Sequence, residues 1–212
     1  MQVIHPGGAP TPAPAHPLTG VTAFTMKRRI SLREQYFELR PLGADGAEGG
    51  VVLYASQRQV SLPEEYRFSA DRRHTRRWLT VRARTRMNLG NAVFEAFDPH
   101  DVPLGWFQYQ WLESQLLHTW RLVAPGVDVL GQQRSAGVGV ARRILSDVPF
   151  ATLFPVPYAF DVQFRDTMDR VVLRIERRAE LRDRYVVTVP EGRVDGRMAA
   201  AMALLLDWRG QA

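Results

Sequence analysis

Arginines recur at every second position of residues 80–87 in this 212-residue chain. If that segment is a β-strand, Arg82, Arg84 and Arg86 share one face, because successive side chains of a strand point to opposite sides. A guanidinium group binds phosphate through paired hydrogen bonds, so this arginine row is a candidate site for an anionic headgroup. Four more arginines lie just upstream, on an expected turn, and belong to the same candidate site: Arg72, Arg73, Arg76 and Arg77.

The arginine row has a second interpretation, in which carboxylates on neighbouring strands neutralise it. Like charges side by side on a sheet repel one another unless anions or carboxylates lie between them. Glu64 and Glu65 are candidates for that role. Another basic region, residues 174–184, has acidic residues among its arginines and predicts a solvated surface of mixed charge. The sequence leaves open whether the arginine row faces solvent.

Residues 98–101, Asp-Pro-His-Asp, have a composition that suits either a cation site or a tight turn. We favour the turn, because Asp and Pro are turn residues and no second histidine lies nearby. The chain has no zinc-ligand spacing, no Gly-x-Ser-x-Gly, no Walker loop and no dinucleotide fingerprint in a strand-then-helix context. We therefore predict a protein that is not an enzyme, with no catalytic residue, metal or cofactor.

The charge balance is basic, since 28 Lys and Arg against 22 Asp and Glu give a formal net charge of +6. A basic balance favours acidic partners such as nucleic acid or anionic lipid. Lys27 is the only lysine, which a coding bias towards arginine explains, so only the placement of the arginines is informative. The chain has no cysteine, no signal-peptide pattern and no membrane-spanning run. We expect a cytoplasmic location, with the inner membrane face as the place of any peripheral binding.

The element around which the chain must fold is a helix expected over residues 196–208. Residues 198–206 are all apolar and good helix formers, and Asp195 can cap the first free amide groups. A rod of about a dozen residues is roughly 18 Å long, too short to cross a bilayer. A helix that is apolar on every face must be buried on every face. The residues assigned to this central helix are Asp195, Met198, Met202, Leu205, Leu206 and Trp208.

Short β-rich segments separated by turns precede the helix. Their spacing of about 8–12 residues is typical of an all-β sandwich or barrel. We expect strands at residues 21–26, 31–39, 51–54, 66–69, 78–87, 92–97, 104–111, 119–123, 127–133, 158–164, 170–175 and 185–189, with a short helix or ordered loop at 137–147. The fold class predicted is mainly β: a closed antiparallel barrel of about 12 strands, filled by the hydrophobic C-terminal α-helix.

The expected domain organisation is a disordered tail followed by one domain. Residues 1–18 contain five prolines among Ala, Gly and Thr and predict a flexible extended tail, leaving residues 19–212 as a single barrel domain. Within the barrel, Phe107, Tyr109 and Trp111 share a strand face and are expected to pack on the central helix. If that row were exposed, it would mark a lipid or partner surface instead.

The chain resembles the tubby C-terminal-like superfamily, and more closely its phospholipid-scramblase and LURP-one-related branch. The resemblance rests on repeated meanders, such as Phe94-Glu-Ala-Phe-Asp98 and Tyr158-Ala-Phe-Asp161, each followed by a turn. It rests above all on the ending, from Val194-Asp195-Gly-Arg197 to Asp207-Trp208. It covers about residues 21–210 and implies a 12-stranded barrel around a hydrophobic C-terminal helix.

The resemblance also implies a function, because members of the superfamily bind phosphoinositides or anionic lipids and some are assigned lipid scrambling. The animal scramblases carry a Cys-rich palmitoylation segment and an acidic calcium-binding segment that this chain does not match, so scrambling is not expected. We predict a non-enzymatic module that binds anionic phospholipid at a membrane surface. The alternative is a protein-interaction or structural module with an incidental basic surface, or a weak nucleic-acid binder. Aromatic residues do not interleave with the arginine row, so no dedicated nucleic-acid role is expected.

Overall fold

The computed structural model describes residues 15–30, 35–57, 64–84, 91–110, 119–133, 160–177 and 184–210. Several predictions made from the sequence fall outside these residues. They concern Arg86, Trp111 and the segment 137–147. Trp208 lies within the C-terminal helix, but its side chain is outside the description.

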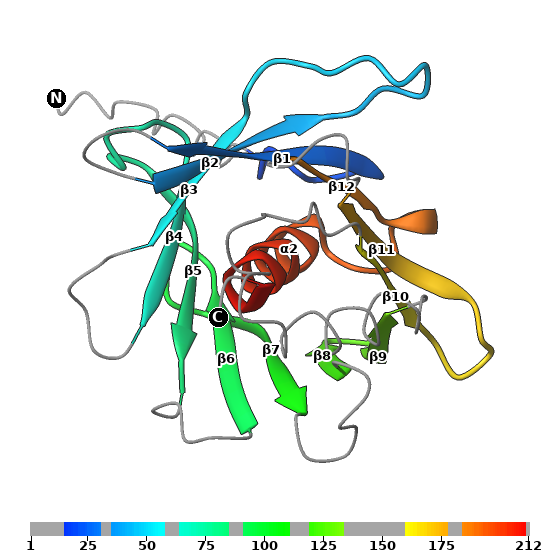
Figure 1. Cartoon of the computed structure of the whole chain (residues 1–212). Helices are drawn as coiled ribbons and strands as arrows, with labels where there is room; N and C mark the ends of the chain where they lie inside the picture. The colour runs from blue at the N-terminus through cyan, green and yellow to red at the C-terminus, as the bar shows by residue number, and fades with distance from the viewer. Residues whose placement is uncertain are drawn as a thin grey trace, which may run out of the picture.

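Twelve strands form one closed antiparallel barrel, as the sequence predicts (Figure 1). Each strand pairs with its neighbours along the chain, and β1 pairs with β12 to close the sheet. The strands are β1 (Ala23–Ile30), β2 (Gln35–Pro41), β3 (Leu53–Gln57), β4 (Glu65–Ser69), β5 (Arg77–Ala83), β6 (Asn91–Phe97), β7 (Pro103–Gln110), β8 (Thr119–Ala124), β9 (Val127–Gln133), β10 (Phe160–Arg165), β11 (Val171–Arg177) and β12 (Arg184–Thr188). A short 3₁₀ helix, η2 (Pro190–Gly192), connects β12 to the helix α2 (Gly196–Gly210).

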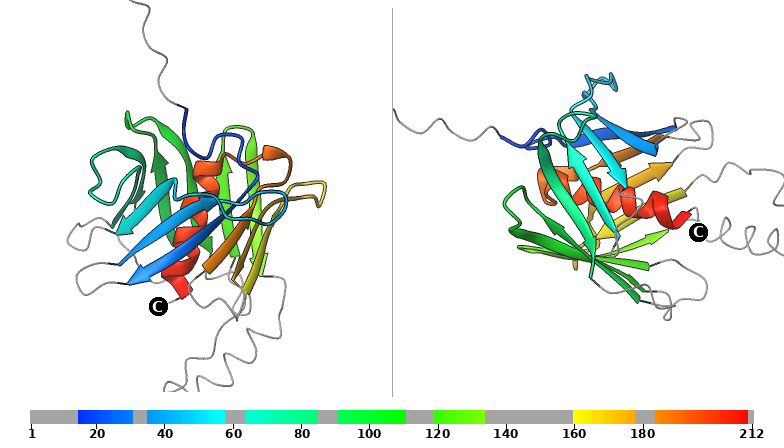
Figure 2. Two further views of the ribbon diagram at one scale, coloured as in Figure 1. Left: turned by 90° about the horizontal axis from the view of Figure 1, so that it is seen from above. Right: turned by 90° about the vertical axis from the view of Figure 1, so that its left-hand side faces the viewer.

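The helix α2 runs through the inside of the barrel (Figures 1 and 2). Met198, Met202 and Leu205 are completely buried, as expected for a helix that is apolar on every face. The strands meet the helix with alternate side chains; Phe107 and Tyr109, for example, are buried as predicted. Within the described residues, no helix is long and apolar enough to cross a bilayer.

Polar contacts hold both ends of α2. At its start, the Asp195 carboxylate accepts a hydrogen bond of 2.8 Å from the backbone amide of Arg197, which confirms Asp195 as the cap. Near its other end, Asp207 is 2% exposed and accepts a hydrogen bond from the hydroxyl of the buried Tyr185. The Arg28 guanidinium lies 3.9 Å from the same carboxylate. A buried carboxylate is tolerated only with such partners, so these contacts fix α2 along the barrel axis.

The packed part of the chain begins earlier than the tail predicted for residues 1–18. Leu18 is 2% exposed and belongs to the core. The His16 ring packs edge-on against Trp78, with 5.2 Å between ring centroids. Leu18 also lies against Gly196, where an added Cβ would come within 2.7 Å of the Leu18 carbonyl oxygen. Residues 16–18 therefore pack beside the start of α2 and are not part of a free tail.

The connections between strands alternate between the two ends of the barrel, because every strand runs antiparallel to its neighbours. Helix α2 begins shortly after β12 ends, and Thr188 of β12 pairs with Ala23 at the start of β1. The same end therefore holds the β2–β3, β4–β5, β6–β7, β8–β9 and β10–β11 turns. We call it the helix-start end. Ile30, the last residue of β1, lies at the opposite end.

Candidate functional site

The turn between β4 and β5, residues 70–76, carries three of the predicted site arginines and is called the basic loop below. It is organised by Asp71, whose carboxylate accepts hydrogen bonds from the Thr75 hydroxyl at 2.6 Å and the Arg73 amide at 2.8 Å. The Thr75 hydroxyl, followed by the loop's backbone amides, holds the pKa of Asp71 below its usual value. The amide of Ala70 donates to the carbonyl of Arg76 at 3.0 Å and closes the loop.

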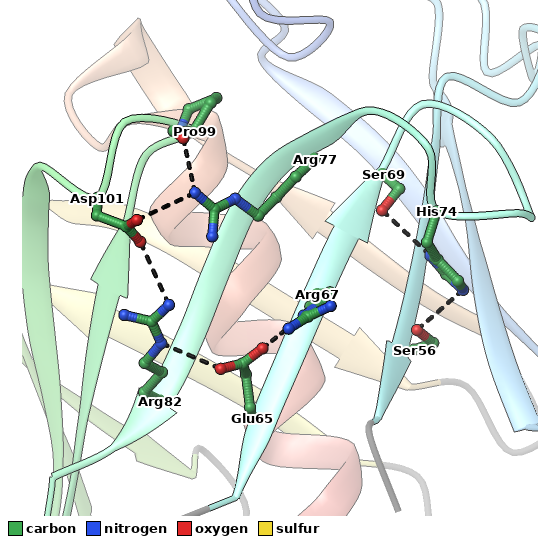
Figure 3. Close-up of polar contacts among 9 residues, drawn as sticks. All are labelled: Ser56, Glu65, Arg67, Ser69, His74, Arg77, Arg82, Pro99 and Asp101. Carbon is green, nitrogen blue, oxygen red and sulfur yellow. Dashed lines mark hydrogen bonds and ion pairs between the residues drawn. The ribbon is translucent and has the colours of Figure 1, made fainter. Parts of the chain in front are cut away.

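His74 docks the basic loop onto the outer face of the barrel (Figure 3). One ring nitrogen lies 3.1 Å from the Ser56 hydroxyl on β3, and the other lies 3.1 Å from the Ser69 hydroxyl on β4. His74 has a φ of 56°, a conformation that costs energy in a residue other than glycine. These two contacts help hold it there. The loop therefore has a defined position on the sheet and does not depend on a ligand for its order.

Arg72, Arg73 and Arg76 are exposed on the basic loop. The Arg72 guanidinium lies 4.4 Å from the centre of the Tyr36 ring, and that of Arg76 lies 4.5 Å from the centre of the Trp78 ring. Aromatic contacts of this kind orient a guanidinium without neutralising its charge. In the part of the chain that the structure describes, no carboxylate forms an ion pair with Arg73 or Arg76. The loop thus presents three guanidinium groups to solvent.

Two further site residues, Arg77 and Arg82, are held by carboxylates (Figure 3). Arg82 donates to Glu65 at 3.1 Å and to Asp101 at 3.3 Å, and Arg77 donates to the other Asp101 oxygen at 3.3 Å. Burial acts to raise the pKa of Glu65, but hydrogen bonds from Arg67 and Arg82 outweigh it and lower the pKa. The hydrogen bond from Arg77 likewise lowers the pKa of Asp101. Both carboxylates therefore stay ionised and neutralise the arginines.

The strand predicted for residues 78–87, which carries the arginine row, is wrong in its extent at Arg84; Arg86 lies outside the described residues. Strand β5 ends at Ala83, where residues up to 87 were expected, so Arg84 already lies beyond it. Arg84 is 65% exposed and lies 3.4 Å from the Glu95 carboxylate on β6. The second interpretation of the row therefore holds for Arg82 and Arg84. The register explains it, because Arg82 is paired with Glu65 on one side and Glu95 on the other.

The segment Asp98 to Asp101 forms a turn between β6 and β7, as favoured from the sequence. The Asp98 carboxylate accepts backbone hydrogen bonds from His100 at 2.8 Å and from Val102 at 2.9 Å. Asp101 points to Arg77 and Arg82 and supplies no free cation ligand. Among the described residues, no group of three or more His, Cys, Asp or Glu side chains is placed to hold a metal ion.

A groove of about 730 Å³ at the helix-start end was not anticipated from the sequence. It lies between the β8–β9 and β10–β11 turns. Strand β9 pairs with β10 only over residues 130–133, so residues 127–129 of β9 pair with β8 alone and leave a gap on the β10 side. The groove is lined by valines and by charged residues; its lining includes Val123, Val127, Val129, Val172, Asp128, Asp166, Arg170 and Arg193. Both arginines contact the same oxygen of Asp166, at 2.8 and 3.1 Å. Only the strand register reveals this groove.

No protein-family model matches this chain, and no curated protein matches it significantly. The arrangement of the basic loop, the ion pairs and the groove is therefore the basis for a functional proposal.

Proposed function

We propose that this protein is a non-enzymatic module that binds anionic phospholipid headgroups at a membrane surface through the basic loop. The observation that carries the proposal is the exposure of Arg72, Arg73 and Arg76 on a loop fixed by Asp71 and His74. The site is smaller than the one expected from the sequence, because Arg77, Arg82 and Arg84 are engaged by carboxylates.

The chemistry of the loop suits phosphate. A guanidinium group offers several N–H donors in one plane and binds phosphate oxygens in pairs. Each basic residue near an anionic membrane surface contributes on the order of 1 kcal/mol of binding free energy. Three residues together give roughly a hundredfold gain in affinity, since 1.4 kcal/mol corresponds to a factor of about ten. A loop that is already ordered loses little conformational freedom when it binds.

The resemblance to the tubby C-terminal-like superfamily supports the same proposal, since its members bind phosphoinositides or anionic lipids. On this proposal the protein acts at the inner face of a membrane as a peripheral binder. Phosphatidylserine and phosphoinositide headgroups share the phosphate chemistry that the arginines recognise, and the experiment below separates them.

A second candidate function is a protein-interaction module with an incidental basic surface. The observation that favours it is the network of Arg77, Arg82, Glu65 and Asp101, which makes the outer face of β4 and β5 a surface of mixed charge. On that alternative the basic loop has no selectivity for lipid and contributes only to solubility.

Sedimentation with vesicles decides between the two candidates. The probes are vesicles of phosphatidylcholine alone, phosphatidylcholine with phosphatidylserine, and phosphatidylcholine with a phosphatidylinositol phosphate. We expect sedimentation with the anionic vesicles only, weakening with salt because exposed charges are screened over about 8–10 Å. Changing Arg72, Arg73 and Arg76 together to Gln should lower the affinity roughly a hundredfold.

Two control variants separate the site from net charge. The variant K27Q/R29Q/R121Q removes the same charge on β1 and β8, away from the turns of the helix-start end, and R82Q/R84Q removes two arginines of the predicted row; both should bind nearly as wild type does. Equal binding by the basic-loop variant and the wild type would remove this site. No sedimentation with any anionic vesicle at low salt would remove the lipid function and leave the interaction module.

A further inference from the structure

We infer that the helix-start end of the barrel is the face that rests on an anionic bilayer, with Met168 inserted among the lipid headgroups. This inference rests on the proposed function and adds to it the orientation of the protein and a second, apolar contact. The basic loop and Met168 lie on different turns, β4–β5 and β10–β11, of the same end of the barrel.

Met168 is an exposed apolar residue on a rigid turn. It is 72% exposed at the tip of the β10–β11 turn. The Asp166 carboxylate accepts hydrogen bonds from the backbone amides of Met168 at 2.9 Å and Arg170 at 3.0 Å. Arg165 donates to the carbonyl of Asp169 at 2.7 Å across the same turn. A side chain presented in this way can enter an interface without reordering the backbone.

Other apolar surface lies at the same end, so Met168 is not an isolated exposed residue. The groove of about 730 Å³ adjoins this turn, with Thr167 in its lining beside four valines. Its volume falls within the range of pockets that hold small ligands, roughly 300–1,000 Å³. Val102, at the β6–β7 turn of the same end, is 53% exposed. Exposed apolar tips and a groove with valines among its charged lining residues share an end with the basic loop. This arrangement fits a charged surface with an apolar layer beneath it.

The two turns differ in how far their arginines are paired with carboxylates. The arginines of the β10–β11 turn are balanced by its own carboxylates: Arg165 lies 3.3 Å from Asp169, and Arg170 lies 2.8 Å from Asp166. That turn is therefore neither strongly attracted to nor repelled by anionic lipid. The attraction comes from the basic loop, and Met168 contributes apolar burial once the end of the barrel is at the surface.

The absence of cysteine in the chain allows a direct test of the orientation. Met168→Cys, Val102→Cys and Ile30→Cys each provide one thiol for an environment-sensitive nitrobenzoxadiazole label. Ile30 is the matched control, since it is 71% exposed and lies at the opposite end of the barrel. All three positions are exposed, so labelling should leave the core intact.

Each labelled protein is mixed with vesicles of phosphatidylcholine and phosphatidylserine, and the bound fraction is measured by sedimentation in the same sample. For bound protein we expect blue-shifted, brighter emission and protection from an aqueous quencher at position 168, a smaller change at 102, and no change at 30. Unlabelled Met168→Ser should bind about fivefold more weakly than wild type. Bound protein whose label at 168 stays as exposed as the label at 30 overturns the orientation and leaves the proposed function standing. No sedimentation of wild type overturns both.

Discussion

Removing the hydroxyl of Tyr185 tests whether the buried polar contact at the end of α2 stabilises the barrel. Tyr185 is completely buried and donates a hydrogen bond to Asp207, which is 2% exposed. Tyr185→Phe keeps the ring and removes only the donor to this carboxylate. Hydrogen bonds to charged groups contribute about 1.5–3 kcal/mol, so we expect a loss of about 2 kcal/mol in the free energy of unfolding. The midpoint of urea unfolding measures it, with an unchanged slope.

Tyr54→Phe is the matched control, because Tyr54 is only half-buried on the outer face of β3, and its effect should stay within about 0.5 kcal/mol. Alkaline pH gives a second readout. Burial, followed by the negative charge of Asp207, raises the pKa of Tyr185 in the folded protein. Its contribution is therefore complete below the unfolded pKa of about 10 and is lost as pH rises above it. Tyr185→Phe should lack that part of the alkaline decline. A Tyr185→Phe variant that is as stable as wild type at neutral pH, and whose stability declines equally above pH 10, would refute the reasoning.

Two further predictions concern the start of α2. Burial, then the charge of Arg197, lowers the pKa of His16 to about 4, with Asp195 opposing them. The unfolded chain takes up this proton below about pH 6.5, so stability should fall between pH 6.5 and 4. The full pKa difference corresponds to about 2 kcal/mol at pH 5, and solvent screening of the partly exposed ring reduces it to about 1 kcal/mol. Urea unfolding of His16→Ala should show a shallower decline. Gly196→Ala should destabilise by about 1–3 kcal/mol despite the helix preference of alanine, because the new Cβ would lie 2.7 Å from the Leu18 carbonyl oxygen. Gly50→Ala, whose Cβ would meet no atom within 4 Å, is its control in thermal unfolding, and equal melting temperatures would contradict the close packing.

The central helix and the barrel were predictable because their signals are local. Nine successive apolar helix formers have only one stable environment, the inside of a domain, and Asp195 marks the start of the helix by its chemistry alone. The strands carry alternating patterns separated by turn residues, and a sheet that encloses a helix has to close. The basic loop was also recognisable as a turn, since Asp71 is a residue that bonds to the backbone amides that follow it.

Which arginines are engaged by carboxylates was decided only by tertiary structure. Arg82 meets Glu65 and Asp101, which lie 17 and 19 residues away along the chain, because strand register and the β6–β7 turn bring them together. Glu65 was a candidate partner from its position in the sequence, whereas no local signal pointed to Asp101 or to Glu95 beside Arg84. The groove likewise depends on where β9 and β10 stop pairing. Local pattern determines which elements form, whereas register determines which charges meet, because a one-residue shift places every side chain of a strand on its other face.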